Sequence, residues 1–216
     1  MGTKAQDREA VWGEIANLRL ELADRFSALE RPQWESASWC EGWRVSDVVG
    51  HLVHIAEATH VSMASDILRN GVLPDRALST VAKRLGNLDG DELVRRLRAA
   101  SGSRFHVPGT PPALELGELM VHGSDALRPL GLDFTPAISN TIPVLNIYSL
   151  VSQLAFHSAP QRSVTLVAND VGWTKGHGPE VRGSSMDLIL LMANRRQITD
   201  SLEGPGLDVL TRSTPK

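Results

Sequence analysis

Apolar residues recur at spacings of three and four along most of the chain, a pattern typical of amphipathic helices. The first stripe predicts a helix over residues 5–29, and its members are Val11, Ile15, Leu18, Leu22 and Phe26. A second stripe predicts a helix that begins after Ser46, as its N-cap, and runs to about Arg69.

The helical pattern continues to about residue 158. Paired prolines suit the first turn of a helix, and proline just beyond a stripe marks its end. On these signals, further helices are predicted over residues 74–85, from Asp89 through Leu97, from Pro111 to before Pro129, and from Ser139 to Phe156.

The pattern changes near the end of the chain. Residues 162–168 alternate between apolar and polar positions, which predicts a strand, and the glycine-rich residues 173–182 predict a second short strand region. Ser184 is expected to cap a last apolar helix, and the tail beyond Glu203 is expected to be loose.

Together these elements predict a mainly α protein with two domains. Residues 1–158 are expected to form a helical bundle, and residues 159–216 a small α+β domain. The length of 216 residues allows one domain or one and a half, and 42% apolar with 22% charged residues is the average of globular proteins. Disordered, collagenous and repeat proteins are thereby disfavoured.

Charge and cysteine content narrow the class further. The net charge of −3 gives no general attraction to nucleic acid or anionic membranes. No apolar run approaches 18 residues and the first residues have no signal-peptide pattern, so a cytoplasmic monomer or homodimer acting on small molecules is expected. The single cysteine excludes an internal disulfide and any cysteine-rich metal site.

One group of residues has the composition of a catalytic metal site. Glu118 and His122 lie four residues apart on one predicted helix and therefore share a face, while His51 and His54 lie on another. Two imidazoles and one carboxylate are the ligands of an open zinc site, which keeps a position for water or substrate. The alternative is an ordinary surface pair between Glu118 and His122.

Three other residues have weaker claims to a role. Asp125 could orient an imidazole as an outer acceptor, or be a solvated helix residue. His106 lies in the proline-rich loop before the Glu118 helix and is either near the site or a surface histidine. Cys40 lies among tryptophans and is interpreted as a packing residue rather than a nucleophile.

Two motifs carry a resemblance to a known family. The segment from Cys40 to Leu52 resembles the C-x-G-W-x-x-x-D-x-x-x-H-L signature of the mycothiol-dependent maleylpyruvate isomerase family. The segment from Glu118 to Asp125 resembles that family's E-x-x-x-H motif with its following aspartate, and residues 166–183 resemble its small C-terminal domain. The resemblance implies a DinB-like four-helix metal-binding bundle.

The resemblance also implies an activity. It assigns the metal, usually zinc, to His51, Glu118 and His122, which selects His51 over His54. It implies that the metal activates mycothiol for transfer to an electrophile or for cis–trans isomerisation of a maleylpyruvate-like substrate. A non-catalytic metal-binding or small-ligand-binding protein of the same fold is the alternative.

The resemblance further implies an arginine that binds the anionic substrate or thiol. Arg195 takes this place and is the candidate catalytic residue, although Arg196 follows it and Asn194 stands where the family has glycine. A solvated cation at the end of a helix is the other interpretation of Arg195.

Overall fold

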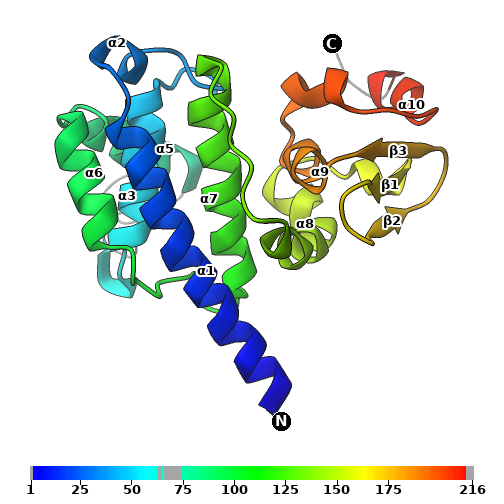
Figure 1. The fold of residues 1–216 in the computed structure, drawn as a ribbon, viewed down its shortest axis with the longest axis horizontal. Helices are drawn as coiled ribbons and strands as arrows, with labels where there is room; N and C mark the ends of the chain where they lie inside the picture. The colour runs from blue at the N-terminus through cyan, green and yellow to red at the C-terminus, as the bar shows by residue number, and fades with distance from the viewer. Residues whose placement is uncertain (1, 63–64, 66–73, 213–216) are drawn as a thin grey trace. The chain divides into compact units, whose positions relative to one another are not determined.

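The computed structural model describes residues 2–62, 65 and 74–212 and divides into two compact units, Met1–Phe134 and Thr135–Lys216 (Figure 1). The fold is mainly helical with one small sheet, as predicted. The division by packing lies earlier than the boundary predicted at 158/159. The reason is that α8 (Thr141–Ala155) packs against α9 (Ser185–Met192) and therefore groups with the second unit.

Helices α1, α3, α6 and α7 of the first unit form a bundle (Figure 1). Helices α1 and α3 each pack against both α6 and α7, which closes the ring. Helix α5 lies on α3, and the single turn α2 comes before α3 in the chain. The helices of this unit are α1 (Gly2–Ser27), α2 (Arg31–Trp34), α3 (Val45–Glu57), α5 (Pro74–Leu85), α6 (Gly90–Ala99) and α7 (Pro112–Leu127), followed by the 3₁₀ turn η1 (Arg128–Leu130).

The predicted stripe of α1 supplies much of the bundle core. Four of its five members are at most 2% exposed, namely Ile15, Leu18, Leu22 and Phe26. Burying each such side chain contributes roughly 1.5–3 kcal/mol. Close contact between α1 and α7 depends on Gly123, where a Cβ atom would lie 2.7 Å from the Phe134 ring and 2.8 Å from Leu22.

The N-terminus of α3 differs from the prediction that Ser46 caps it. The N-cap is Arg44, whose backbone N–H donates to the Asp47 carboxylate at 2.9 Å, and Ser46 lies inside the first turn. The Asp47 carboxylate, three residues after the cap residue, replaces the expected serine cap because it reaches back to the free N–H of Arg44. The Arg44 guanidinium also binds this carboxylate, and the pair raises the pKa of Arg44.

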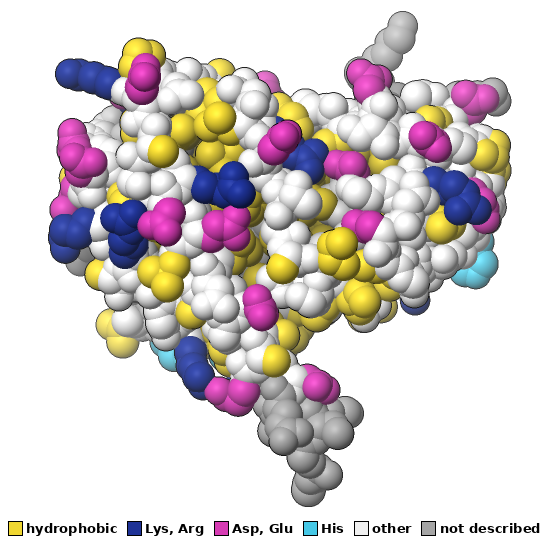
Figure 2. All heavy atoms as spheres, viewed as in Figure 1, with side chains coloured by type: hydrophobic (Ala, Val, Ile, Leu, Met, Phe, Trp, Pro, Cys, Tyr) yellow, Lys and Arg dark blue, Asp and Glu magenta, His cyan; other side chains and the backbone are white. Residues whose placement is uncertain are grey.

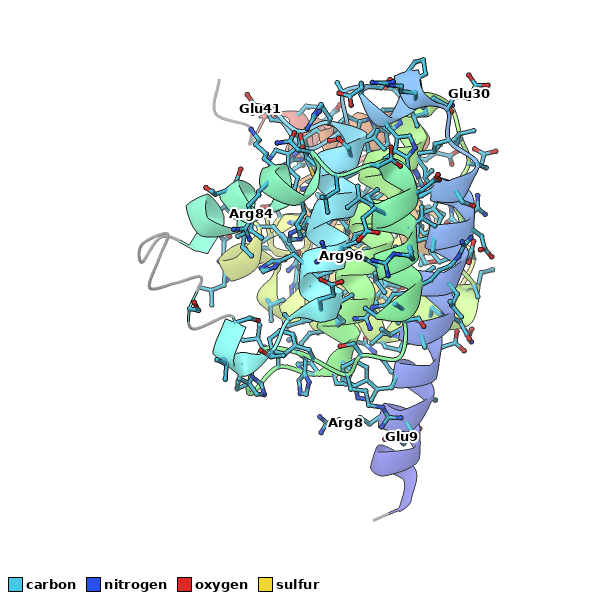
Figure 3. All side chains as sticks on the ribbon, turned by 90° about the vertical axis from the view of Figure 1, so that its left-hand side faces the viewer. Arg8, Glu9, Glu30, Glu41, Arg84 and Arg96 are labelled. Atoms are coloured by element: carbon cyan, nitrogen blue, oxygen red, sulfur yellow. The ribbon has the colours of Figure 1, made fainter. Side chains whose placement is uncertain are left out.

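The C-terminus of α3 was also wrongly predicted. The helix ends at Glu57, and Ala58 is extended, because Thr59 and Ser62 cap each other and begin a new helical turn. Arg69, the predicted end, lies outside the described residues. Arg96 on α6 forms an ion pair with Glu57 and so joins the ends of two bundle helices (Figure 3).

In the second unit, α9 packs against a three-stranded sheet of order β2-β1-β3, and α8 packs on α9. Strand β1 runs antiparallel to β2 and parallel to β3, and α9 packs on both β1 and β3. The Ser184 hydroxyl accepts from the Asp187 N–H at 3.1 Å, which confirms the predicted cap of α9. The strands are β1 (Thr165–Ala168), β2 (Thr174–Gly176) and β3 (Glu180–Gly183), with 3₁₀ turns η2 (Ile138–Asn140), η3 (Pro160–Arg162) and η4 (Arg196–Ser201).

The described part of the tail, to residue 212, is ordered rather than loose, which corrects the prediction. Glu203 exchanges two backbone hydrogen bonds with Arg182, and the Gly206 N–H donates to the Glu180 carbonyl at 2.8 Å. Helix α10 (Leu207–Arg212) then buries Leu210. The sequence pattern missed this because a glycine–proline–glycine run is typical of loops, whereas here it lets the chain lie close to β3.

The distribution of surface charge and the hydropathy of the helices both bear on function. Acidic and basic side chains are interspersed on the face drawn in Figure 2. Within the described residues, no helix is both long and apolar enough to cross a membrane.

Candidate metal centre

The bundle brings the three predicted ligands together. His51 lies on α3, and Glu118 and His122 lie one turn apart on α7, which packs against α3. The Glu118 Oε2 atom lies 3.6 Å from His51 Nε2 and 3.4 Å from His122 Nε2. The two imidazole rings meet edge to face, with centroids 4.6 Å apart. Two ring nitrogens therefore converge on one carboxylate oxygen.

This spacing fits a divalent ion. Ligand atoms at 2.0–2.1 Å from a tetrahedral zinc lie roughly 3.3–3.5 Å from one another. Of the two distances to Glu118, 3.4 Å lies within this range and 3.6 Å just above it, and the three ligand atoms all lie within 4.8 Å of one another. Nitrogen and oxygen donors without sulfur suit zinc and related divalent ions.

The cluster is shielded on the histidine side and more open at the carboxylate. The side chains of His51 and His122 are 6% and 15% exposed, while that of Glu118 is 31% exposed. The half-buried Trp43 ring packs edge-on against His51 at 5.6 Å between centroids. A small ligand could reach an ion held here from the Glu118 side, and catalytic zinc sites require such an open position.

Electrostatics within the cluster follow from burial and from these contacts. Burial lowers the pKa of His51, against the opposing effect of Glu118. Burial alone would raise the pKa of Glu118, but the two imidazoles outweigh it and hold that pKa well below its usual range. Burial likewise opposes the charge on His122, yet Asp125, Cys40 and Glu118 raise the pKa of His122 well above its usual value. The contacts with Asp125, Cys40 and Glu118 therefore favour the charged form of His122, whereas burial favours the neutral form of His51.

Two further residues contact His122 at its other ring nitrogen. The Asp125 Oδ2 atom lies 3.0 Å from His122 Nδ1, and the Cys40 Sγ atom lies 3.1 Å from the same oxygen and 3.7 Å from that nitrogen. The outer role considered for Asp125 therefore has a geometric basis. The interpretation of Cys40 as packing alone missed its contact with the site.

The other histidines considered do not join the cluster. His106 packs against Trp12, with ring centroids 5.5 Å apart, and its Nε2 lies 3.2 Å from the Arg8 guanidinium. His54, also on α3, lies outside both candidate ligand groups that the described residues form.

The fold and its motifs have known relatives. Residues 15–106 match the family model described as the mycothiol maleylpyruvate isomerase N-terminal domain. These residues, somewhat less than half of the chain, are similar to the domain that this model describes. The match includes His51 and the first motif but ends before Glu118 and His122, so the family model does not reach the second motif.

Solved structures extend the likeness over nearly the whole chain. The crystal structure of a mycothiol-dependent maleylpyruvate isomerase with a histidine-to-alanine mutation is 16% identical, covers 96% of this chain and 94% of its own, and superposes with a TM-score of 0.58. The crystal structure of the enzyme without that mutation has the same identity and coverage and a TM-score of 0.53. At this identity they show the fold. No curated protein matches the chain.

The structure explains the spacing of the isomerase-family motif at residues 40–52. Gly42 has a φ of 73°, a left-handed conformation that suits glycine and turns the loop so that the Trp43 N–H donates to the Cys40 carbonyl at 3.0 Å. The turn directs Cys40 toward Asp125 and Trp43 toward His51. The aspartate of the motif caps α3, and one turn later comes the first histidine.

Asn194 stands before Arg195, where the resemblance leads us to expect glycine, and the turn is kept. Asn194 has a φ of 63°, and the Arg195 N–H donates to the Leu190 carbonyl at 2.8 Å, as in the C-terminal motif that usually uses glycine. The Arg195 guanidinium donates to the Ala193 carbonyl at 2.8 Å. Arg195 belongs to the second unit, and its role in binding an anion stays a prediction.

This turn makes a measurable prediction. Asn194→Ala should lower the free energy of unfolding by about 1–2 kcal/mol, because alanine is strained in the left-handed conformation. Asn194→Gly should leave stability within about 0.5 kcal/mol of the original, since glycine adopts this conformation freely. Urea unfolding of the full chain would measure both. Equal losses for the two variants would show that the asparagine side chain, rather than the backbone angle, stabilises the turn.

Proposed function

We propose that this chain is a divalent-metal-dependent enzyme that uses mycothiol as its thiol. His51, Glu118 and His122 are proposed to hold the ion, most favourably zinc. The observation that carries the proposal is the convergence of two imidazole nitrogens on one Glu118 oxygen at 3.6 and 3.4 Å. The family match of residues 15–106 and the similarity to the isomerase structures support the choice of mycothiol.

The chain's own groups define what the site can do. One carboxylate among two neutral imidazoles leaves a bound divalent ion with a net positive charge, which favours an anionic ligand. When bound, the ion lowers the pKa of a coordinated thiol enough to ionise it near neutral pH. The Trp43 ring beside His51 limits water on that side. The more exposed Glu118 side is left for the thiol and its substrate.

A thiolate in this place supports two related reactions. Addition to the double bond of a maleylpyruvate-like substrate converts it to a single bond that can rotate, and elimination then gives the trans isomer and returns the thiol. Displacement of a leaving group from an electrophile gives a thioether instead. Arg195 is proposed to bind a substrate carboxylate, since a guanidinium pairs with it through two hydrogen bonds. We place the reaction in the cytoplasm, where such thiols stay reduced.

Metal analysis tests the ligand set. The purified protein should hold one divalent ion per chain, and His122→Ala should lose it because the remaining imidazole and carboxylate make an incomplete site. His177→Ala, a variant of an exposed histidine in the second unit, should keep the metal. Elemental analysis after dialysis would measure both, and unchanged metal content in His122→Ala would contradict the assignment.

A second assay separates an enzyme from a binding protein of the same fold. The metal-loaded protein is incubated with mycothiol and either maleylpyruvate or a panel of electrophiles, and products are identified by mass spectrometry. We expect an isomerised product or a mycothiol adduct that needs both metal and thiol. Bound metal without any product would favour the non-catalytic alternative.

A further inference from the structure

His122 is contacted from its second ring nitrogen by a pair that the proposed ligand set does not include. Asp125 is fully buried, and its Oδ2 atom lies 3.0 Å from His122 Nδ1 and 3.1 Å from Cys40 Sγ. An ionised carboxylate can only accept hydrogen bonds, so both the imidazole N–H and the thiol S–H donate to this one oxygen.

We propose that Asp125 and Cys40 are positioning residues that prepare His122 to bind metal, an inference that rests on the proposed function. By accepting from Nδ1, Asp125 keeps the proton on that nitrogen. The lone pair of Nε2 is then available, and this atom faces Glu118 at 3.4 Å. Partners of this kind fix the tautomer and orientation of a metal-binding histidine.

Cys40 contributes by fixing the carboxylate. Its thiol donates to the same oxygen that holds His122, and the neighbouring backbone ties the loop to α7, because the Trp39 N–H donates to the Asp125 carbonyl at 3.0 Å. Asp125 is thus held by the loop through both its side chain and its backbone. The loop is closed in turn by Ser38, whose hydroxyl accepts from the Cys40 N–H at 3.1 Å.

The geometry favours a positioning role for Cys40 over a ligand role. Cys40, His122 and Asp125 could in principle hold an ion themselves. On a tetrahedral zinc, however, sulfur and oxygen ligands lie roughly 3.5 Å apart. The observed 3.1 Å is shorter and suits a hydrogen bond. A metal ion bound at His122 Nδ1 would also have to displace the hydrogen bond between this nitrogen and Asp125.

Zinc affinity measured on folded protein tests the inference. Asp125→Asn should lower the zinc affinity about 10–100-fold, because a neutral amide oxygen is a weaker acceptor than a carboxylate oxygen and holds the proton on His122 Nδ1 less firmly. Cys40→Ser, whose hydroxyl can still donate, should keep a zinc affinity close to the original. The affinity of Cys40→Ala should lie between those of Cys40→Ser and Asp125→Asn. Asp91→Asn, at an exposed position on α6, is the matched control. A chromophoric chelator in competition gives each affinity, and urea unfolding without metal gives the stability.

The outcomes are separable. A purely structural pair would lower metal-free stability in Asp125→Asn but leave the affinity of the folded protein unchanged, and this result would overturn the inference. A sulfur-to-cobalt charge-transfer band in the cobalt form that disappears in Cys40→Ser would overturn it too, since Cys40 would then be a ligand. If the unsubstituted protein binds no metal at all, the proposed function itself fails.

Discussion

Arg19→Met is expected to lower the free energy of unfolding by about 3–5 kcal/mol, the usual cost of breaking a buried ion pair from one side. The Arg19 side chain is fully buried and donates to Glu115 at 2.6 Å. It also donates to the carbonyls of Ser101 and Ser103 at 3.2 and 2.7 Å. One guanidinium on α1 therefore ties the segment after α6 to α7, and a methionine of similar length satisfies none of these acceptors.

The loss should depend on pH in a defined direction. Burial raises the pKa of Glu115 to about 7, although Arg19 opposes the rise. A folded pKa above the unfolded one means that this carboxyl's contribution to stability is complete below about pH 4.5 and is lost as the pH rises through 7. Without Arg19 the folded pKa rises further. The deficit of Arg19→Met should therefore be larger at pH 8 than at pH 5.

Two companion variants make the measurement decisive. Glu115→Gln keeps the shape and one acceptor for Arg19, so it should cost only about 1 kcal/mol near pH 7 and should flatten the dependence of stability on pH between 5 and 8. Arg95→Met, at an exposed pair with Glu92, should leave stability unchanged. Urea unfolding at pH 5, 7 and 8 measures all of them. A deficit for Arg19→Met that shrinks as the pH rises would show that Glu115 does not carry the effect.

The sequence patterns that predicted structure correctly depend on residues that lie close together in the chain. The α1 stripe and the Ser184 cap depend on residues within a turn of one another, and both were confirmed. The end of α3 was missed because a continuing apolar pattern concealed the mutual capping of Thr59 and Ser62. The placement of α8 in the second unit was missed for another reason. It depends on packing against α9, which no pattern within α8 records.

The candidate site was likewise predictable where its residues are close in sequence and not where they are distant. The spacing of Glu118 and His122 places both on one face of a helix, but which histidine of α3 faces them was left open by spacing and chosen by the resemblance. The structure brings His51 to the cluster. The contact of Cys40 with Asp125 joins residues on a loop and a helix far apart in sequence. Only the motif itself could have signalled it, since glycine and tryptophan at fixed distances from a cysteine indicate a shaped loop.

Glu118→Gln should have the largest effect on the proposed activity. Glu118 is the sole anion of the proposed ligand set and the group on which both imidazole nitrogens converge. An amide oxygen is a weaker donor to a divalent ion than a carboxylate oxygen. Metal affinity should therefore fall by more than the 10–100-fold that loss of an outer partner costs. Metal-dependent turnover of mycothiol and substrate should fall by roughly 10³-fold or more, since several kcal/mol of charge stabilisation are lost.

In the metal-free protein, the same substitution should make both His51 and His122 harder to protonate. In the unsubstituted protein, Glu118 helps to raise the pKa of His122 and opposes the lowering of that of His51 by burial. Nuclear magnetic resonance titration of the metal-free protein should show both histidine pKa values lowered in Glu118→Gln. Glu92→Gln, an exposed variant on α6, should change neither the titrations nor the metal content. Full metal binding and activity in Glu118→Gln would show that the carboxylate is not a metal ligand. The convergence of the two histidines on it would then have no role in metal binding.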